Sequence, residues 1–357
     1  MTPELGEDRF GATSGSRVSR LSVPALSEVS FEQLRLERLE RLQSSLRRHG
    51  LPVCLLYNPG NIRYATGVAL MDVWAPPYSN RMGEPLAVDK LDTPGWLSLQ
   101  DEGIRILDVS PATIDAREIK TGQEIALCKI NGAIGDAMLA AFEAAIRPGV
   151  REYELLAVLA DTLLRYQGEA VFSRLVASGT NTNPWLREAS DKLVMPGDIV
   201  AVDTDANGYE GYVIDVSRTF LCGERPTPDQ QDAYRAAYEC VVGMAELVRP
   251  GMSFEDFCYA APRLPERYRP QRYSFQVHQA GLEDEGPFIP YPEDVESGAL
   301  SVPDRELQEG MVLCLECYAG EVGASFGVKL EDQLLVTADG CELLSTYPFD
   351  ATLLGGL

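Results

Sequence analysis

The chain repeats itself, and this repeat limits its fold more than any other feature. "RPGVREYEL", which begins at Arg147, and "RPGMSFEDF", which begins at Arg249, each read as the end of one helix and an acidic, aromatic start of the next. "MPGDIVAVD" and "QEGMVLCLE" each run from a glycine turn into an apolar strand, with an acid six residues after the glycine. Those acids are Asp203 and Glu316. The pattern predicts an internal duplication with two helices and a strand ribbon in each half.

The chain is expected to have three parts, of which the last contains the repeat. Residues 1–27 are rich in Ser, Gly and Arg and are expected to form a loose arm. Residues 28–115 are expected to form a small α/β domain, which is short because residues 75–105 show little pattern and are rich in Pro and Gly. Residues 116–357 contain the repeat and are expected to form the catalytic domain.

Apolar spacing predicts the elements inside these parts. The N-terminal domain should begin with an amphipathic helix, a buried strand, and then a turn with a short strand, at residues 30–50, 51–58 and 59–67. The catalytic domain should contain helices at residues 117–149, 151–168, 229–251 and 253–261.

Charge and cysteine content narrow the classes of partner and compartment. A net charge of -23 argues against nucleic acid and anionic membrane surfaces as partners. No apolar run reaches the length expected of a membrane span, and the first residues lack the pattern of a signal peptide. The 8 cysteines show no disulfide spacing, so a reducing cytoplasm is expected. Cys314 and Cys317 form a CxxC whose sulfurs strand alternation sends to opposite faces, so both are interpreted as core residues.

Carboxylates collect on strands that otherwise look buried. Asp203, Asp205 and Asp215 lie in "AVDTDANGYEGYVIDVSRTF", Glu316 ends "VLCLE" and Glu331 lies in "GVKLEDQLLV". On exposed faces such acids would simply be solvated. Here the flanking residues are typical of buried strands, where carboxylates are costly unless a cation or a proton neutralises them. Oxygen-rich sets of this kind hold divalent ions, and a carboxylate often bridges the two ions of a two-metal site.

Nitrogen ligands are scarce, because the chain has only 2 histidines. His49 ends the first helix beside Arg47 and Arg48, where a surface cation is favoured, so it is not expected to bind metal. His278 precedes a glycine-containing loop with three acids at residues 283–285. A lone histidine is more often an ordinary hydrogen-bonding residue, but the nearby acids favour a ligand role for His278.

Taken in order, these residues resemble the metal site of a known superfamily. The order Asp, Asp, His, Glu, Glu on a duplicated frame is similar to that of the pita-bread proteins, the M24 superfamily of methionine aminopeptidase, prolidase and creatinase. "GYVIDVSRTF" resembles its GYxxDxTRTF motif, "KLEDQLLVT" its terminal ligand strand and "NIRYATG" the beginning of its N-terminal domain. The likeness covers roughly residues 35–75 and 115–350.

The resemblance implies an α+β fold, with a duplicated αβ pita-bread catalytic domain after a shortened creatinase-like N-terminal domain. It also implies two divalent or transition metal ions. The implied ligands are Asp205, Asp215, His278, Glu316 and Glu331. Asp203 joins this set because the repeat places it opposite Glu316.

Two departures from the superfamily point away from peptide hydrolysis. Peptidases of this fold keep further histidines near the metals, but Pro184-Trp185 stands where one has a Pro-His step. Asp284-Glu285 stands near the position of another. These replacements resemble the DddP-type dimethylsulfoniopropionate lyases, which combine DTD, a third Asp, a TNPW step, a Tyr five residues before the ligand His and an Asp six residues after it.

That closer resemblance implies β-elimination of a small sulfonium carboxylate to dimethyl sulfide and acrylate. Asp284 would be the base, and Tyr273 would orient the substrate or help proton transfer. Aromatic faces suit a sulfonium cation, so Trp185 and Trp74 are candidate substrate contacts, with core or interface packing as the alternative for each. The lyases suggest iron, while manganese, zinc and cobalt stay open. A homodimer is expected.

Two other functions remain open from the sequence. One is a metallohydrolase acting on an Xaa-Pro, creatine-like or amide substrate, and the shortage of histidines counts against it. The other is a non-catalytic binding module that has kept the fold, and the complete set of predicted ligands counts against that.

Overall fold

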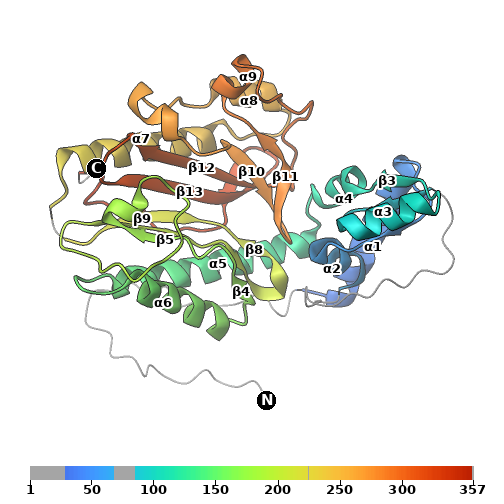
Figure 1. Ribbon diagram of the computed structural model, residues 1–357, viewed down its shortest axis with the longest axis horizontal. Helices are drawn as coiled ribbons and strands as arrows, with labels where there is room; N and C mark the ends of the chain where they lie inside the picture. The colour runs from blue at the N-terminus through green and yellow to red at the C-terminus, as the bar shows by residue number, and fades with distance from the viewer. Residues whose placement is uncertain (1–28, 68–84, 224, 356–357) are drawn as a thin grey trace.

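The structure is a computed structural model that describes residues 29–67, 85–223 and 225–355. Figure 1 shows a larger body of strands and helices, with a smaller group of helices beside it formed by the N-terminal residues. The expected N-terminal arm and Trp74 lie outside the described residues.

The smaller group is a short α/β unit. Its strands form a parallel sheet in the order β1-β2-β3, and α1 packs against α4 and α2. Its elements are α1 (Phe31–Arg48), β1 (Cys54–Leu55), α2 (Pro59–Thr66), β2 (Leu86–Val88), α3 (Thr93–Asp101), β3 (Ile106–Asp108) and α4 (Ser110–Arg117).

Residues 59–67 were predicted to be a turn and a short strand, and this prediction is wrong because they form α2. The side chain of Asn58 accepts a hydrogen bond from the backbone N–H of Asn61 at 2.8 Å, so it caps the N-terminus. Pro59 stands at the start of the helix, and Gly67 ends it with φ 75°. These capping residues favour a helix over the predicted turn and strand.

The larger body is built from two similar halves, as the repeat predicts. The first half contains α5 (Gly122–Ala145), α6 (Glu152–Arg165), β4 (Ala170–Val171), β5 (Val176–Ser178), β6 (Ile199–Asp203), β7 (Ala206–Asn207), β8 (Val213–Ile214) and β9 (Ser217–Leu221). The second half contains α7 (Pro228–Leu247), α8 (Phe254–Ala260), β10 (Val277–Ala280), β11 (Asp284–Ile289), α9 (Pro292–Glu296), β12 (Val312–Gly320), β13 (Gly327–Val336) and β14 (Cys341–Leu343).

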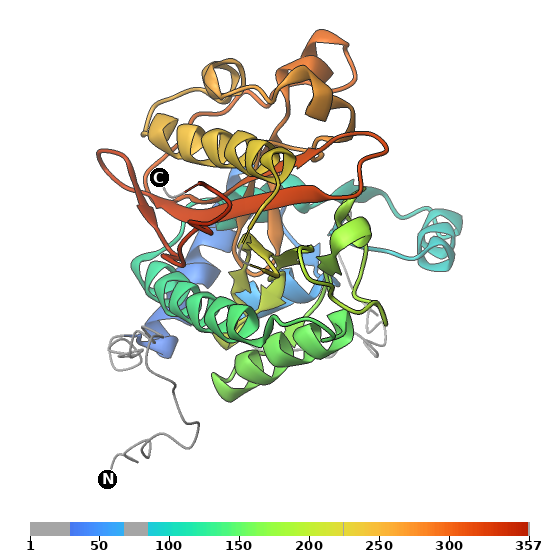
Figure 2. The same ribbon diagram turned by 90° about the vertical axis from the view of Figure 1, so that its left-hand side faces the viewer.

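The strands of the two halves meet along β9 and β13. One sheet has the order β11-β10-β12-β13-β14, and others have the orders β5-β6-β9 and β4-β7-β8. Thr219 Oγ1 on β9 donates to the carbonyl of Lys329 on β13 at 2.7 Å, and Arg218 Nη1 donates to the carbonyl of Glu331 at 2.6 Å. Figure 2 shows β12 and β13 running between α7 on one side and α5 on the other.

This layering creates a separate core under each helix pair. Leu127 and Leu155 lie in the core of the first pair, and Tyr234 and Phe257 lie in that of the second. Cys314 belongs to the first core and Cys317 to the second, so the two sulfurs do lie on opposite faces of β12 as predicted.

The central helix α5 is more apolar than the sequence analysis allowed. By length and composition it could cross a membrane. Of its most apolar 18 residues, 56% are buried within the fold, which is typical of the core helix of a globular protein.

Candidate metal centre

The predicted metal ligands lie together in the larger body, although they come from distant parts of the sequence. Asp203, Asp205 and Asp215 can each offer an oxygen within 4.8 Å of the others. Asp215 also belongs to a second group that includes His278 and Glu331, with the same spacing limit. Because Asp215 is common to both groups, it stands where a bridging carboxylate would be needed.

Strand register brings the remaining acid into the same place. Glu316 on β12 lies directly opposite Glu331 on β13. Asp203 at the end of β6 lies opposite Ser217 on β9, and Ser217 Oγ donates to Glu331 Oε2 at 2.9 Å. Cross-strand neighbours on one face lie close enough to interact directly, so the pairing itself assembles the acids.

His278 turns one ring nitrogen toward these acids. Its Nε2 lies 3.3 Å from Asp215, 3.4 Å from Glu331 and 3.6 Å from Glu316. Its Nδ1 lies 3.0 Å from the backbone carbonyl of Gln279, which acts as the acceptor if Nδ1 carries the proton. A histidine anchored in this way presents Nε2 as a metal ligand.

Burial and the charges of neighbouring acids make ionisation of these carboxylates unfavourable. Burial, reinforced by Asp203, raises the pKa of Asp205 to about 8. Burial likewise raises the pKa of Glu316 to about 8 and that of Asp215 well above its ordinary value. Carboxylates pushed this far toward protonation are stabilised in their charged form by a cation.

The residues present fit divalent metal ions. One buried oxygen of each of four acids has no hydrogen-bond partner in the structure, and these atoms are Asp203 Oδ1, Asp215 Oδ1, Glu316 Oε1 and Glu331 Oε1. Unpaired buried oxygens are rare in folded proteins and call for an explanation such as an ion. Several carboxylates with one imidazole suit a divalent transition ion.

Lys329 is a functional candidate that the sequence analysis missed. Its side chain is fully buried, and Nζ lies 2.7 Å from Glu331, 2.9 Å from Glu316 and 3.3 Å from Asp203. Although burial opposes it, Lys329 holds the pKa of Glu331 at about 2, together with His278. The signal was available, because Lys329 stands two residues before Glu331 and therefore shares its face of the strand.

Cys314 was interpreted only as a core residue, but it also borders the site. Its sulfur falls within the group formed by Asp215, His278 and Glu331. Cys314 stands two residues before Glu316 on β12, which is the same relation that links Lys329 to Glu331. Burial raises the pKa of its thiol well above the ordinary value, which disfavours the thiolate that a metal would need.

Asp284 lines a cleft and lies close enough to the metal-ligand set for the charges of His278, Glu331 and Asp203 to act on its pKa. It lines a cavity of about 650 Å³ between α2 and the hairpin of β10 and β11, together with Arg63 and Phe172. Asp284 is exposed to this cleft, yet the surrounding protein still raises its pKa to about 6 by desolvation, with Glu331 adding to the effect. Its neighbour Glu285 is buried and paired with Lys120 at 2.9 Å.

The aromatic candidates lie deeper than the cleft. Trp185 is 8% exposed and stacks on Tyr318 with ring centroids 6.2 Å apart. Tyr273 packs against the same small cluster, and its ring lies 4.6 Å from Lys329 Nζ. The face of Tyr273 is therefore already occupied by a cation, while Trp185 is mostly covered by protein.

His49 lies apart from this centre. It ends α1 in the smaller unit, where Nε2 lies 2.7 Å from Asp115. In the described part of the chain, His278 is consequently the histidine that contacts the acids.

A fold of two αβ halves around a buried acid-and-histidine set defines a class of metal-dependent enzymes. The sequence model of metallopeptidase family M24 matches residues 126–338. The chain belongs to metallopeptidase family M24, whose enzymes use divalent metal ions. The predictions of an α+β pita-bread fold and of this superfamily are confirmed.

Individual relatives fall into two groups. The chain is 35% identical to the dimethylsulfoniopropionate lyase DddP of Roseovarius nubinhibens over 276 residues, which are 76% of this chain and 61% of the relative. It is 32% identical to the Xaa-Pro dipeptidase of Pyrococcus furiosus over 240 residues, or 65% of this chain and 64% of the relative. The chain thus spans less than two thirds of the length of these relatives.

Among solved structures, the Xaa-Pro dipeptidase of Bacillus anthracis superposes with a TM-score of 0.70. The match covers 88% of this chain and 99% of that chain at 25% identity. Similarity therefore extends over both the smaller N-terminal unit and the larger body.

Proposed function

We propose that this protein is a metal-dependent lyase that releases dimethyl sulfide from dimethylsulfoniopropionate and leaves acrylate. The observation that carries the proposal is the position of Asp284, a cleft-facing carboxylate within electrostatic reach of His278 and Glu331 in a metal-ligand set that contains one imidazole. The 35% identity to a dimethylsulfoniopropionate lyase supports the same reading.

The elimination needs one base and one leaving group. Asp284 takes a proton from the carbon next to the substrate carboxylate. The electron pair of that C–H bond becomes the second bond of acrylate, and the C–S bond breaks so that sulfur leaves with its electron pair as neutral dimethyl sulfide. With a pKa of about 6, Asp284 is ionised at neutral pH and still basic enough to accept the proton.

The chain's other residues prepare this step. Asp203, Asp205, Asp215, His278, Glu316 and Glu331 are the proposed holders of two divalent ions, with iron suggested by the lyase relatives. Such an ion, when bound, stabilises negative charge that develops on the substrate carboxylate. Burial raises the pKa of Tyr273 far above its ordinary value, so its phenol stays protonated and can donate a hydrogen bond to the substrate.

The sulfonium group needs an aromatic or apolar surface. Trp185 remains the proposed contact, through the face of its indole ring, and Trp74 is proposed for the same role. We further propose that the enzyme works as a cytoplasmic homodimer. Light scattering would then give twice the chain mass of 39.1 kDa.

The deciding experiment measures dimethyl sulfide in the headspace above iron-loaded protein given dimethylsulfoniopropionate. Release that disappears in an Asp215→Ala variant would support the lyase. A folded, metal-replete protein that releases no dimethyl sulfide but cleaves Xaa-Pro dipeptides would replace the proposal with the hydrolase that its dipeptidase relatives represent. A protein that never retains metal would favour the binding module.

A further inference from the structure

The hairpin that carries Asp284 is closed by one of its own acids. β10 and β11 pair Ala280 with Asp284 across a short turn. Within the turn, the backbone N–H of Gly281 donates to the carbonyl of Glu283 at 3.0 Å. The N–H of Leu282 donates to Glu285 Oε1 at 3.3 Å. The Glu285 carboxylate therefore folds back over the turn, where a side chain in place of Gly281 would collide with it.

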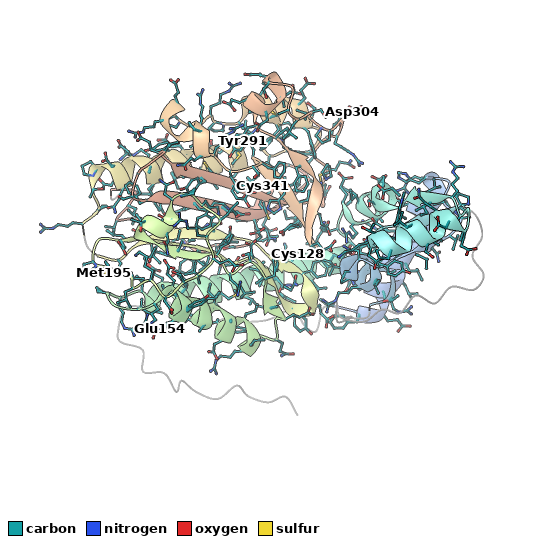
Figure 3. All side chains as sticks on the ribbon, viewed as in Figure 1. Cys128, Glu154, Met195, Tyr291, Asp304 and Cys341 are labelled. Atoms are coloured by element: carbon teal, nitrogen blue, oxygen red, sulfur yellow. The ribbon has the colours of Figure 1, made fainter. Side chains whose placement is uncertain are left out.

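Two basic residues from the junction of the smaller unit and the larger body hold this acid. Lys120 Nζ lies 2.9 Å from Glu285 Oε2, and Arg117 Nε lies 3.4 Å from Glu285 Oε1. The side chains of Lys120 and Glu285 are 1% and 3% exposed, so water screens this pair little. Figure 3 labels Cys128 on α5. Burial raises the pKa of its thiol to about 12, and the charges of Lys120 and Glu285 also act on it.

The acid on the other side of Asp284 is held as well. Arg117 Nη1 donates to Glu283 Oε2 at 3.1 Å. Asn58 Nδ2, from the cap of α2, donates to Glu283 Oε1 at 2.6 Å. Gly60 leaves room for this contact, because a Cβ there would lie 2.8 Å from the carboxyl carbon of Glu283. Residues of the smaller unit and of the junction thus bind the side chains of both neighbours of Asp284.

The geometry of the hairpin determines which way each of these side chains points. Asp284 and Glu285 are the first two residues of β11, and side chains alternate along a strand, so these two point to opposite sides. Glu285 is buried against Lys120, whereas Asp284 lines the cleft. Glu283 lines the same cleft, but its carboxylate is held by Arg117 and Asn58. In the described residues, no Lys or Arg pairs with Asp284.

We propose that Arg117 and Lys120 are positioning residues, which hold Glu283 and Glu285 in place so that the Asp284 carboxylate between them stays directed toward the metal-ligand set. The inference rests on the proposed role of Asp284 as the base. It assigns a catalytic consequence to a contact between the smaller unit and the larger body. If Glu283 or Glu285 is released, the hairpin can rotate and Asp284 no longer points at the substrate.

The test removes both ion pairs of Glu285 without leaving a buried charge alone, because Arg117 keeps Glu283 as its partner. A Lys120→Met/Glu285→Gln double variant neutralises both partners. The matched control is Arg38→Met/Glu124→Gln, a buried pair at 3.4 Å that joins α1 to α5 and has no hydrogen bond to residues 281–285. Circular dichroism and metal analysis establish that each variant is folded and loaded.

Two measurements distinguish a role in positioning Asp284 from a general contribution to the stability of the fold. Amide exchange in a peptide spanning residues 279–289 should become roughly 10-fold faster in the double variant and stay unchanged in the control. With dimethylsulfoniopropionate, kcat should fall about 10- to 100-fold while KM changes less than about 3-fold, because a displaced base harms the chemical step more than binding. Lys120→Arg keeps the charge and should retain most of kcat.

Other results would overturn the inference. These are unchanged exchange in the hairpin, an equal loss of kcat in the control, or a loss of kcat that merely follows a loss of metal. A metal-replete wild-type protein without lyase activity would refute the proposed function and the catalytic role of the two cations with it. In that case the exchange result would still decide whether the two cations hold the hairpin.

Discussion

At the scale of single residues, position alone gives neighbouring carboxylates different properties. Glu331 touches Lys329 and His278, which hold its pKa at about 2 in spite of burial. Burial raises the pKa of Asp284 to about 6, and among the described residues no lysine or arginine forms an ion pair with it. The first is fixed as an anion, as a metal ligand must be, and the second can exchange a proton near neutral pH.

Replacing the base should separate chemistry from metal binding. Asp284→Asn keeps the size and hydrogen-bonding capacity of the side chain but cannot accept the proton. We expect kcat for dimethyl sulfide release to fall by roughly 10²–10⁴ while the metal content measured by mass spectrometry is unchanged. Asp339→Asn, at an exposed acid in the turn before β14, is the control. Wild-type turnover by Asp284→Asn would remove Asp284 from the mechanism.

Lys329 should matter most when metal is absent. Lys329→Met leaves Glu331, Glu316 and Asp203 without their ammonium partner, and we expect the metal-free protein to lose about 3–5 kcal/mol of unfolding free energy. Divalent ions supply compensating charge, so the loss should shrink in loaded protein. Denaturant titrations with and without chelator measure both. Lys129→Met, from an exposed pair with Glu342, should change stability by less than about 1 kcal/mol. An equal loss in loaded and metal-free Lys329→Met protein would contradict this account.

At the scale of elements, the repeat and the apolar runs predicted the larger body well. Long, periodic segments such as α5 and α7 carry capping residues and a buried face, so the local signal and the tertiary packing agree. The ligand strands were found because Asp203, Glu316 and Glu331 interrupt apolar runs. The predictions failed where the signal was short: β1 has 2 residues, and α2 depends on its caps more than on apolar spacing.

Side-chain partners were harder to predict than elements. Lys329 looks like an ordinary strand residue until β13 is paired with β12 and packed against β9, since its contacts lie on three separate strands. The same holds for Lys120 and Glu285, which are 165 residues apart in the sequence. Long-range pairing cannot be read from local periodicity, so the acids were predictable and their cations were not.

One helix contact gives a direct test of the packing between α5 and the C-terminal strands. Gly132 lies so near the carbonyl of Leu344 that a methyl group would collide with backbone. Gly132→Ala should therefore lower the unfolding free energy by about 1–3 kcal/mol, although alanine normally favours a helix by about 1 kcal/mol. Gly122→Ala, at the start of the same helix with open space around it, should be neutral or stabilising in the same denaturant titration. Equal stability of the two variants would mean that α5 does not approach Leu344 so closely.

At the scale of the whole molecule, charge and architecture meet in the metal centre. The chain carries a net charge of -23, and the buried acids Asp203, Glu316 and Glu331 lie where β6, β9, β12 and β13 converge. Those strands also join the two halves of the fold. Repulsion among the acids therefore acts on the connection between halves, and cations bound there stabilise the folded protein as a whole.

Removing metal should consequently lower global stability as well as activity. A ligand that binds only the folded state stabilises it by about 2.7 kcal/mol when its concentration is 100 times its dissociation constant. We expect the melting temperature of loaded protein to exceed that of chelated protein by several degrees, and readdition of the metal to restore it. Asp215→Ala removes the carboxylate common to both ligand groups, so its melting temperature should respond little to metal. Glu342→Ala, at an exposed acid on β14, should behave like wild type. Binding energy that is confined to the folded state has to appear in the melting temperature. If chelated and loaded wild-type protein melt at the same temperature while metal analysis confirms binding, the ions therefore do not stabilise the connection between the two halves.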